Sequence, residues 1–193
     1  MIPNQLFNPP GNFLLFEKAF QPMTKKLLLM LLFVCAFATN SWAQTAAQRP
    51  ILQVDDFIAS VRANSTARSA NSQAARISSL VRDAQPTAYY QSGTLKLPEE
   101  GQPVRLYTNI ASLPAIQNGV SGFAPDVVEM VRIKVANASQ LNGGIDLSAF
   151  SGFPNLRFIY IASDVEVTPE MINSALVNDN PNYQIFFENL KYN

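Results

Sequence analysis

Apolar residues recur at every third position in the segment 145–161. The repeating positions are Leu147, Phe150, Phe153, Leu156 and Ile159, and Ile161 follows two residues later. Asp164 comes next, so this part of the chain ends as L-x-x-I-x-I-x-x-D. The alternation in Ile159-Tyr160-Ile161 predicts a short strand with one buried side, and the aspartate predicts the turn that closes it.

Three other segments have the same strand pattern. The four predicted strands are Val104–Tyr107, Val131–Lys134, Ile159–Ile161 and Ile185–Phe187, and their first residues lie 27, 28 and 26 positions apart. Pro154-Asn155 and Pro181-Asn182 repeat at a distance of 27 residues as well. The return paths differ: Thr168-Pro169-Glu170 is typical of a helix start, whereas residues 112–119 predict a shorter helical turn. The chain is therefore predicted to repeat a unit of one strand and one return segment.

This pattern resembles the leucine-rich repeat, L-x-x-L-x-L-x-x-N, whose period is 20 to 29 residues. The resemblance covers about Pro103 to Phe187 and is clearest in the third unit; the first unit has Gly101 where a leading leucine would stand. It implies an α/β fold, a short solenoid of about four parallel strands preceded by N-terminal helices. It also implies a ligand-binding scaffold, and no functional residue carries over. The alternative is a small α/β domain whose parallel strands are spaced by similar helices.

Strand alternation assigns side chains to two faces of the predicted sheet. The inward set is Val104, Leu106, Val131, Ile133, Ile159 and Ile161. The outward set, which we predict to be the binding site, is Arg105, Tyr107, Arg132, Lys134, Phe158 and Tyr160. Aromatic side chains beside arginine are typical of binding hot spots. The alternative is a solvated basic face, with Phe158 and Tyr160 packed under the C-terminal residues 188–193.

Residues 44–102 are expected to form a helical lead-in to the repeat domain at 103–193. Two short apolar faces at helical spacing predict two helices between Val54 and Gln85, joined by the polar segment 62–73. Pro86 is expected to end the second helix. Because a stack of repeats leaves its end uncovered, we expect these helices to cap the first repeat.

The N-terminal region resembles a secretory signal peptide at residues 23–43. Lys25 and Lys26 precede a 12-residue apolar run, Leu27–Ala38, and small residues stand at Ser41 and Ala43. A run of this length is too short to span a bilayer, so the mature chain, 44–193, is expected to have no stable membrane span. Residues 1–22 are interpreted as an extension before the true start at Met23. Cys35 lies within the apolar run, and lipid modification there is the less favoured reading.

Composition limits the chemistry that this chain can perform. There is no histidine, Cys35 is the only cysteine, and 14 basic residues balance 14 acidic ones. A Ser-His-Asp triad and a histidine metal site are therefore excluded, and no strong field favours nucleic acid. We predict an exported, periplasmic or extracellular bacterial protein that is non-catalytic, needs no cofactor or metal, and binds another protein or a cell-surface glycan. The alternative is a small hydrolase or lyase that uses Asp164 and Glu166.

Overall fold

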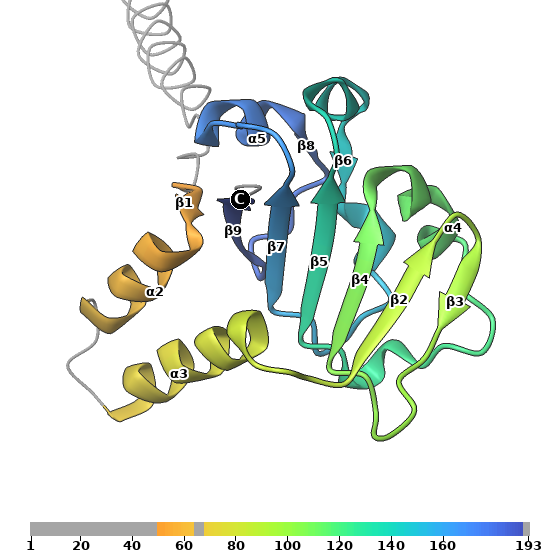
Figure 1. Cartoon of the computed structure of the whole chain (residues 1–193), viewed down its shortest axis with the longest axis horizontal. Coiled ribbons are helices and arrows are strands. Elements are labelled where there is room, and N and C mark those ends of the chain that lie inside the picture. The colour runs from red at the N-terminus through yellow and green to blue at the C-terminus, as the bar shows by residue number, and fades with distance from the viewer. Residues whose placement is uncertain (1–49, 64–67, 191–193) are drawn as a thin grey trace, which may run out of the picture. The chain divides into compact units, whose positions relative to one another are not determined.

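A mostly parallel sheet of seven strands forms the centre of the computed structural model, which describes residues 50–63 and 68–190. Five strands lie side by side in chain order: β2 (Thr87–Gln91), β4 (Arg105–Asn109), β5 (Met130–Val135), β7 (Phe158–Ser163) and β9 (Gln184–Asn189). They are parallel to one another. β1 (Leu52–Gln53) lies parallel beside β9, and β3 (Thr94–Lys96) lies antiparallel beside β2. Figure 1 shows the sheet from its front face.

The four strands predicted from the repeat pattern are β4, β5, β7 and β9. Each is one to three residues longer than its apolar pattern, and neighbours in the pattern are neighbours in the sheet. The mixed α/β class and the parallel pairing are therefore confirmed. The inward residues lie on one face, with Leu106, Val131, Ile133, Ile159 and Ile161 all fully buried. Val104 is an exception, because it precedes β4 and packs with the cluster on the opposite face.

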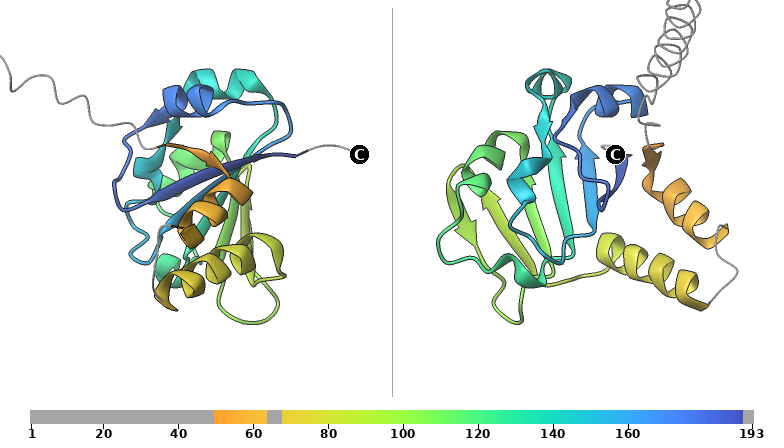
Figure 2. Two further views of the ribbon diagram at one scale, coloured as in Figure 1. Left: turned by 90° about the vertical axis from the view of Figure 1, so that its left-hand side faces the viewer. Right: turned by 180° about the vertical axis from the view of Figure 1, so that it is seen from behind.

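The return segments cover the rear face of the sheet, which Figure 2 shows from behind. Their described elements are η2 (Ile110–Ser112), α4 (Leu113–Gln117), η3 (Pro125–Val127), η4 (Ala138–Gly143), β6 (Ile145–Asp146), η5 (Leu147–Phe150), α5 (Pro169–Ala175) and β8 (Leu176–Val177). Leu113, Ile116, Phe150, Phe153 and Ile172 from these segments share one core cluster with the inward strand residues. β6 and β8 pair in parallel, so two successive return segments also lie side by side.

Polar residues begin the return segments at the ends of the strands. Asn109, the last residue of β4, accepts a hydrogen bond from the amide of Ser112, and Asn137 accepts one from the amide of Gln140. Thr168 accepts a hydrogen bond from the amide of Met171, and Pro169 is the first residue of α5, as its sequence predicted. These caps satisfy amide groups that a short helix leaves unpaired. They let the chain turn back directly after a buried strand.

Two N-terminal helices, α2 (Val54–Ala63) and α3 (Arg68–Arg82), pack against the front face of the sheet. Ile58 of α2 and Ile77 and Leu80 of α3 contact a cluster that includes Phe158 and Phe186. Both helices and their apolar faces were predicted, but residues 68–73, which were expected to belong to the polar join, form the first part of α3. Their position differs from the expected one, because they cover the side of β7 and β9 and do not cap the first repeat strand. In Figure 1 they lie beside β9 and β7 and leave the front of β5, β4 and β2 free of helix.

A hairpin formed by β2 and β3 occupies the edge next to β4. Residues 87–96 were assigned to the helical lead-in, so these two strands were missed. Tyr90 pairs with Leu95 and Gln91 pairs with Thr94, which leaves Ser92 and Gly93 as a two-residue turn. Both turn residues have positive φ, 50° and 78°, the conformation that a type I′ turn requires.

The predicted signal peptide, 23–43, and the extension before it, 1–22, lie outside the described residues. Within residues 50–63 and 68–190, no helix has the length and apolar character needed to cross a membrane.

Candidate binding site on the front of the sheet

Five side chains form a continuous row across the front face of the sheet. Register places Tyr89 beside Tyr107, Tyr107 beside Arg132, Arg132 beside Tyr160, and Tyr160 beside Phe186. We call these five residues, Tyr89, Tyr107, Arg132, Tyr160 and Phe186, the aromatic row. Its members come from five neighbouring parallel strands, and the register of these strands brings them together. Side chains at paired positions on one face are close enough to interact.

One end of the aromatic row is buried under α2 and α3. Phe186 has no exposed surface, and Tyr160 is 3% exposed. The ring of Phe57 in α2 stacks on Phe186 with centroids 4.8 Å apart, and Tyr160 stacks on Phe186 from the other side at 5.6 Å. Stacked aromatic pairs at these distances contribute beyond the area they bury. This half of the row therefore holds the helices to the sheet.

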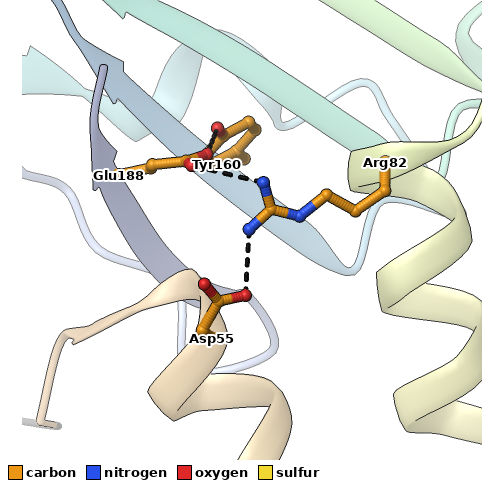
Figure 3. A network of polar contacts seen from close by, with 4 residues as sticks. All are labelled: Asp55, Arg82, Tyr160 and Glu188. Atoms are coloured by element: carbon orange, nitrogen blue, oxygen red, sulfur yellow. Dashed lines mark hydrogen bonds and ion pairs between the residues drawn. The ribbon is translucent and has the colours of Figure 1, made fainter. Parts of the chain in front are cut away.

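A polar network closes the buried end (Figure 3). The Tyr160 hydroxyl donates to the Glu188 carboxylate, and the Arg82 guanidinium forms ion pairs with Glu188 at 3.3 Å and with Asp55 at 2.9 Å. Burial raises the pKa of the Tyr160 phenol, and the hydrogen bond to Glu188 raises it further. Arg82 joins the end of α3 to the start of α2 and to β9. Because Asp55 and much of Arg82 are exposed, these ion pairs add little stability by themselves.

The other end of the aromatic row reaches solvent. Tyr89 is 48% exposed, and its ring lies 5.5 Å from the ring of the half-buried Tyr107. A shallow pocket with a volume of about 50 Å³ opens beside them, between the row and the end of α3. Its polar lining comes from Thr87, Tyr89, Arg105, Tyr107, Arg132 and Tyr160. A pocket of this size has room for a small group, not for a whole drug-sized molecule.

Arg132 lies at the centre of the row, between the two tyrosines of the neighbouring strands. Its guanidinium carbon is 5.3 Å from the centre of the Tyr107 ring and 5.2 Å from that of Tyr160. Both distances are within the range of attractive cation–π contacts. The Nε atom is buried and has no hydrogen-bond partner. A buried donor without a partner lowers the stability of the folded state. The need to pack the core therefore does not explain why an arginine stands at this position.

Arg105, the second arginine of the pocket, forms hydrogen bonds with backbone carbonyls at the end of α3. Its guanidinium donates to the carbonyl of Leu80 at 2.7 Å, to the Thr87 hydroxyl at 3.0 Å and to the carbonyl of Gln85 at 3.3 Å. Burial lowers the pKa of Arg105, and the nearby positive charge of Arg132 lowers it too. Arg105 was predicted to be an exposed binding residue, and the structure gives it a structural role at a helix C-terminus.

Carboxylates on the front face have other cationic partners. Glu129, the residue before β5, accepts two hydrogen bonds from the guanidinium of Arg76 in α3, at 2.6 and 3.1 Å. Glu188 pairs with Arg82, and Asp164 pairs with Lys134 at 2.8 Å. Among the described residues, neither Arg105 nor Arg132 forms an ion pair. The pocket therefore carries two positive charges and no carboxylate in contact with them.

Two of the six predicted binding residues are not available to a ligand. Phe158 is 1% exposed and Tyr160 is 3% exposed, because α2 and α3 dock over them. Their predicted exposure was wrong. The alternative, that they pack under the C-terminal residues 188–193, holds in part: Glu188 accepts the Tyr160 hydroxyl and Leu190 packs against the same cluster, while α2 and α3 supply the rest of the cover. Lys134 shares the front face but is paired with Asp164. Tyr107 and Arg132 remain accessible and lie together at the pocket.

The carboxylates of the alternative enzymatic hypothesis lie apart from the pocket. Asp164 directly follows β7, donates its amide to the carbonyl of Val135 and holds Lys134 with its side chain. Glu166 is exposed. Over the described part of the chain, no three acidic or cysteine side chains gather in a geometry that could hold a metal ion.

Sequence reasoning missed Thr87 and Tyr89, because it placed them in the lead-in. A signal was present: Thr87-Ala88-Tyr89-Tyr90 is rich in β-branched and aromatic residues, and Ser92-Gly93 follows it. Such a run before a Ser-Gly pair is typical of a hairpin. Recognising it would have added a fifth strand and the exposed end of the aromatic row.

Comparison with known proteins adds no homologue to this description. No protein-family model, no curated protein and no solved structure matches the chain.

Proposed function

We propose that this chain is an exported, non-catalytic binding module. Its ligand-contacting surface is the exposed end of the aromatic row, Tyr89, Tyr107 and Arg132, together with the pocket beside it. The ligand is another protein or a cell-surface glycan. One observation carries the proposal: a row of aromatic side chains crosses the sheet, is sealed by helices at one end, and is left open around an unpaired arginine at the other.

The proposal includes a leucine-rich-repeat-like solenoid as the scaffold. Three features support this architecture. Successive strands are parallel neighbours in chain order, their return segments lie on one face, and β6 and β8 form a second parallel pair on the return side. A repeat that stacks on its neighbours buries a face that one copy cannot bury alone. Solenoids of this kind use the exposed side of the strand ribbon for binding.

The chemical character of the open surface supports binding over a purely structural role. Tyrosine and arginine are enriched in binding hot spots. Tyrosine buries a large area while losing little conformational entropy, and arginine presents a planar, pre-organised set of hydrogen-bond donors. The buried half of the same row shows that side chains at these positions can seal an interface, because Phe57 packs on Phe186 there. The open half offers Tyr89 and Tyr107 as a tilted pair of rings with centroids 5.5 Å apart. No described helix covers the front of β2 and β4, the strands that carry them (Figure 1).

A binding screen with matched variants tests this proposal. The purified protein is applied to a glycan array and to a displayed peptide library, in parallel with Tyr89→Ala and Tyr107→Ala. Val177→Ala is the control, because Val177 is an exposed apolar residue on β8, in the return segments. We expect binders whose affinity falls about tenfold or more in the tyrosine variants and stays unchanged in the control. Binders that tolerate both tyrosine variants would place the site elsewhere.

A further inference from the structure

We propose that Arg132 is the anchor for a ligand carboxylate, supplied by an acidic peptide segment. This inference rests on the proposed function and names the chemical class that the open end of the aromatic row recognises. The guanidinium of Arg132 lies between Tyr107 and Tyr160 and forms no hydrogen bond or ion pair within the described residues.

The two tyrosines restrict how a ligand can approach Arg132. They come from the strands on either side of β5, so their rings occupy the two sides of the guanidinium. The buried Nε atom is closed to solvent, which leaves the two terminal nitrogens for a ligand. A carboxylate is flat and accepts two parallel N–H···O bonds from such a fork. The pocket of about 50 Å³ has room for a group of that size.

The charge around the pocket also selects an anion. Arg105 lies on the same face one strand away, and its three hydrogen bonds to uncharged oxygens leave its positive charge uncompensated. The carboxylates of Glu129 and Glu188 are held by Arg76 and Arg82. Inside a partly desolvated pocket, an incoming carboxylate therefore gains attraction from two cations, and no carboxylate is among the described residues that line the pocket.

A peptide is the better source of this carboxylate. Tyr89 and Tyr107 flank the pocket as exposed or half-exposed rings, and tyrosine beside arginine is the composition of hot spots in protein interfaces. An aspartate or glutamate of an extended segment could place its carboxylate on Arg132 while its neighbours cover the two rings. Net affinity would then come from the rings, and orientation from the arginine.

The test follows the side-chain Nε–H signals of arginine by NMR while a probe is added to the purified protein. Acetate is the minimal probe, N-acetyl-aspartate N-methylamide represents a peptide, methyl glucuronide represents an acidic sugar, and sulfate represents a tetrahedral anion. We expect saturable shifts of the Arg132 signal with acetate and stronger binding of the aspartate probe. Arg157, an exposed arginine over the Phe158 ring, is the internal control and should show no saturable shift.

Two variants complete the test. Arg132→Lys keeps the charge but loses the planar fork, so it should weaken aspartate-probe binding about tenfold or more. Arg157→Lys should leave binding unchanged. Acetate shifts that do not saturate, or an Arg132→Lys variant that binds as well as wild type, would overturn the proposal. Tighter binding of sulfate would overturn the carboxylate preference, and tighter binding of glucuronide would overturn the peptide source.

The outcome separates this inference from the proposed function. If acetate leaves Arg132 unaffected while the library still yields binders that depend on Tyr89 and Tyr107, the carboxylate anchor is wrong and the binding surface stands. If acetate binds Arg132 but no peptide or glycan binder depends on those tyrosines, the anion site is real and the proposed binding surface is wrong.

Discussion

Arg132 is packed between aromatic rings and also has a buried hydrogen-bond donor without a partner, a combination that is uncommon in stable proteins. Its guanidinium lies between two tyrosine rings, and its Nε atom is buried without a hydrogen-bond partner. Cation–π contacts offset part of the desolvation cost, by about 0.5–2 kcal/mol each. An unsatisfied buried donor costs about 1–3 kcal/mol, so the residue contributes little or nothing to the free energy of unfolding. A side chain that lowers the free energy of unfolding and does not support the fold is typical of a functional position.

Replacing Arg132 with methionine tests that interpretation. Methionine fills a similar volume and removes the charge together with the buried, unpaired donor, and such exchanges are often neutral or stabilising. We expect the free energy of unfolding of Arg132→Met to equal that of wild type or to rise by about 1 kcal/mol. Denaturant unfolding measures it, with Arg157→Met as the control. A loss larger than about 1 kcal/mol would mean that the arginine is a structural residue.

Tyr160 makes stability depend on pH in the alkaline range. Burial and the hydrogen bond to Glu188 raise the pKa of its phenol above the ordinary value of about 10. The folded state therefore holds this proton more tightly than the unfolded state. The resulting stability is fully present below about pH 10 and is lost as the pH rises from there toward the folded-state pKa. Burial raises the pKa of Tyr183 too, which adds a contribution of the same sign.

The variant Tyr160→Phe should lose part of this alkaline dependence. At neutral pH we expect a loss of about 1 kcal/mol, because Glu188 loses a hydrogen-bond donor. Above about pH 10, the difference between variant and wild type should shrink as the wild type loses its extra stability. Denaturant midpoints across this range measure both effects. Parallel curves at all pH values would show that the Tyr160 phenol does not differ between the folded and unfolded states.

At the scale of elements, the triplet pattern of residues 147–156 builds the return segment between β5 and β7. Phe150, Phe153 and Leu156 are buried in the rear core, and the rings of Phe150 and Phe153 meet edge to face at 5.5 Å. The Tyr183 hydroxyl donates to the carbonyl of Phe150, which ties the next return segment to this one. These contacts join successive units into one core.

Truncation of this pattern should destabilise the whole chain. We expect Phe153→Ala and Leu156→Ala each to lower the free energy of unfolding by about 2–5 kcal/mol, through lost burial and the cavity that remains. Leu97→Ala is the control, since Leu97 is 51% exposed and should change stability by less than about 0.5 kcal/mol. Core variants that unfold at the control's denaturant midpoint would contradict the packing described here.

Helices α2 and α3 decide which half of the front face can bind. Ala74, Ile77 and Leu80 of α3 are fully buried, and Arg76 anchors the same helix to Glu129. Arg105 holds the end of α3 through the carbonyls of Leu80 and Gln85. The helices thus seal β7 and β9 and end at the edge of the pocket, to which Leu80 and Val81 contribute. The binding surface is what their docking leaves open.

At the scale of the whole molecule, the chain is predicted to act after export. The order of Lys25-Lys26, the apolar run and Ser41-Trp42-Ala43 predicts cleavage after Ala43. We expect the intact mass of protein recovered from the periplasm or the medium to correspond to a chain that begins at Gln44. A recovered mass that still includes Leu27–Ala38 would contradict this prediction. Cleavage at Ala43 would leave β1 and its pairing with β9 intact, since β1 begins at Leu52.

Much of the fold followed from the sequence because its signals are local. Alternation in Val131–Lys134 and Ile159–Ile161 specified strands, and helical spacing in Ala74, Ile77 and Leu80 specified α3. Thr168 and Pro169 marked the start of α5. Alternation also predicted that Arg105, Tyr107 and Arg132 share a face, since neighbouring side chains in a strand point to opposite sides.

Long-range packing decided the rest. The alternation of apolar and polar residues in a strand predicts which side of the sheet a side chain faces. It does not predict which other segment of the chain covers that side. Helices α2 and α3 pack over the front side chains of β7 and β9, and these include Phe158, Tyr160 and Phe186. In the described part of the chain, no helix packs over Tyr89 and Tyr107. The open pocket and the unpaired Arg132 exist only through that placement. The sequence by itself therefore determined the strands, the helices and the two faces, and the tertiary structure alone determined which residues of the front face a ligand can reach.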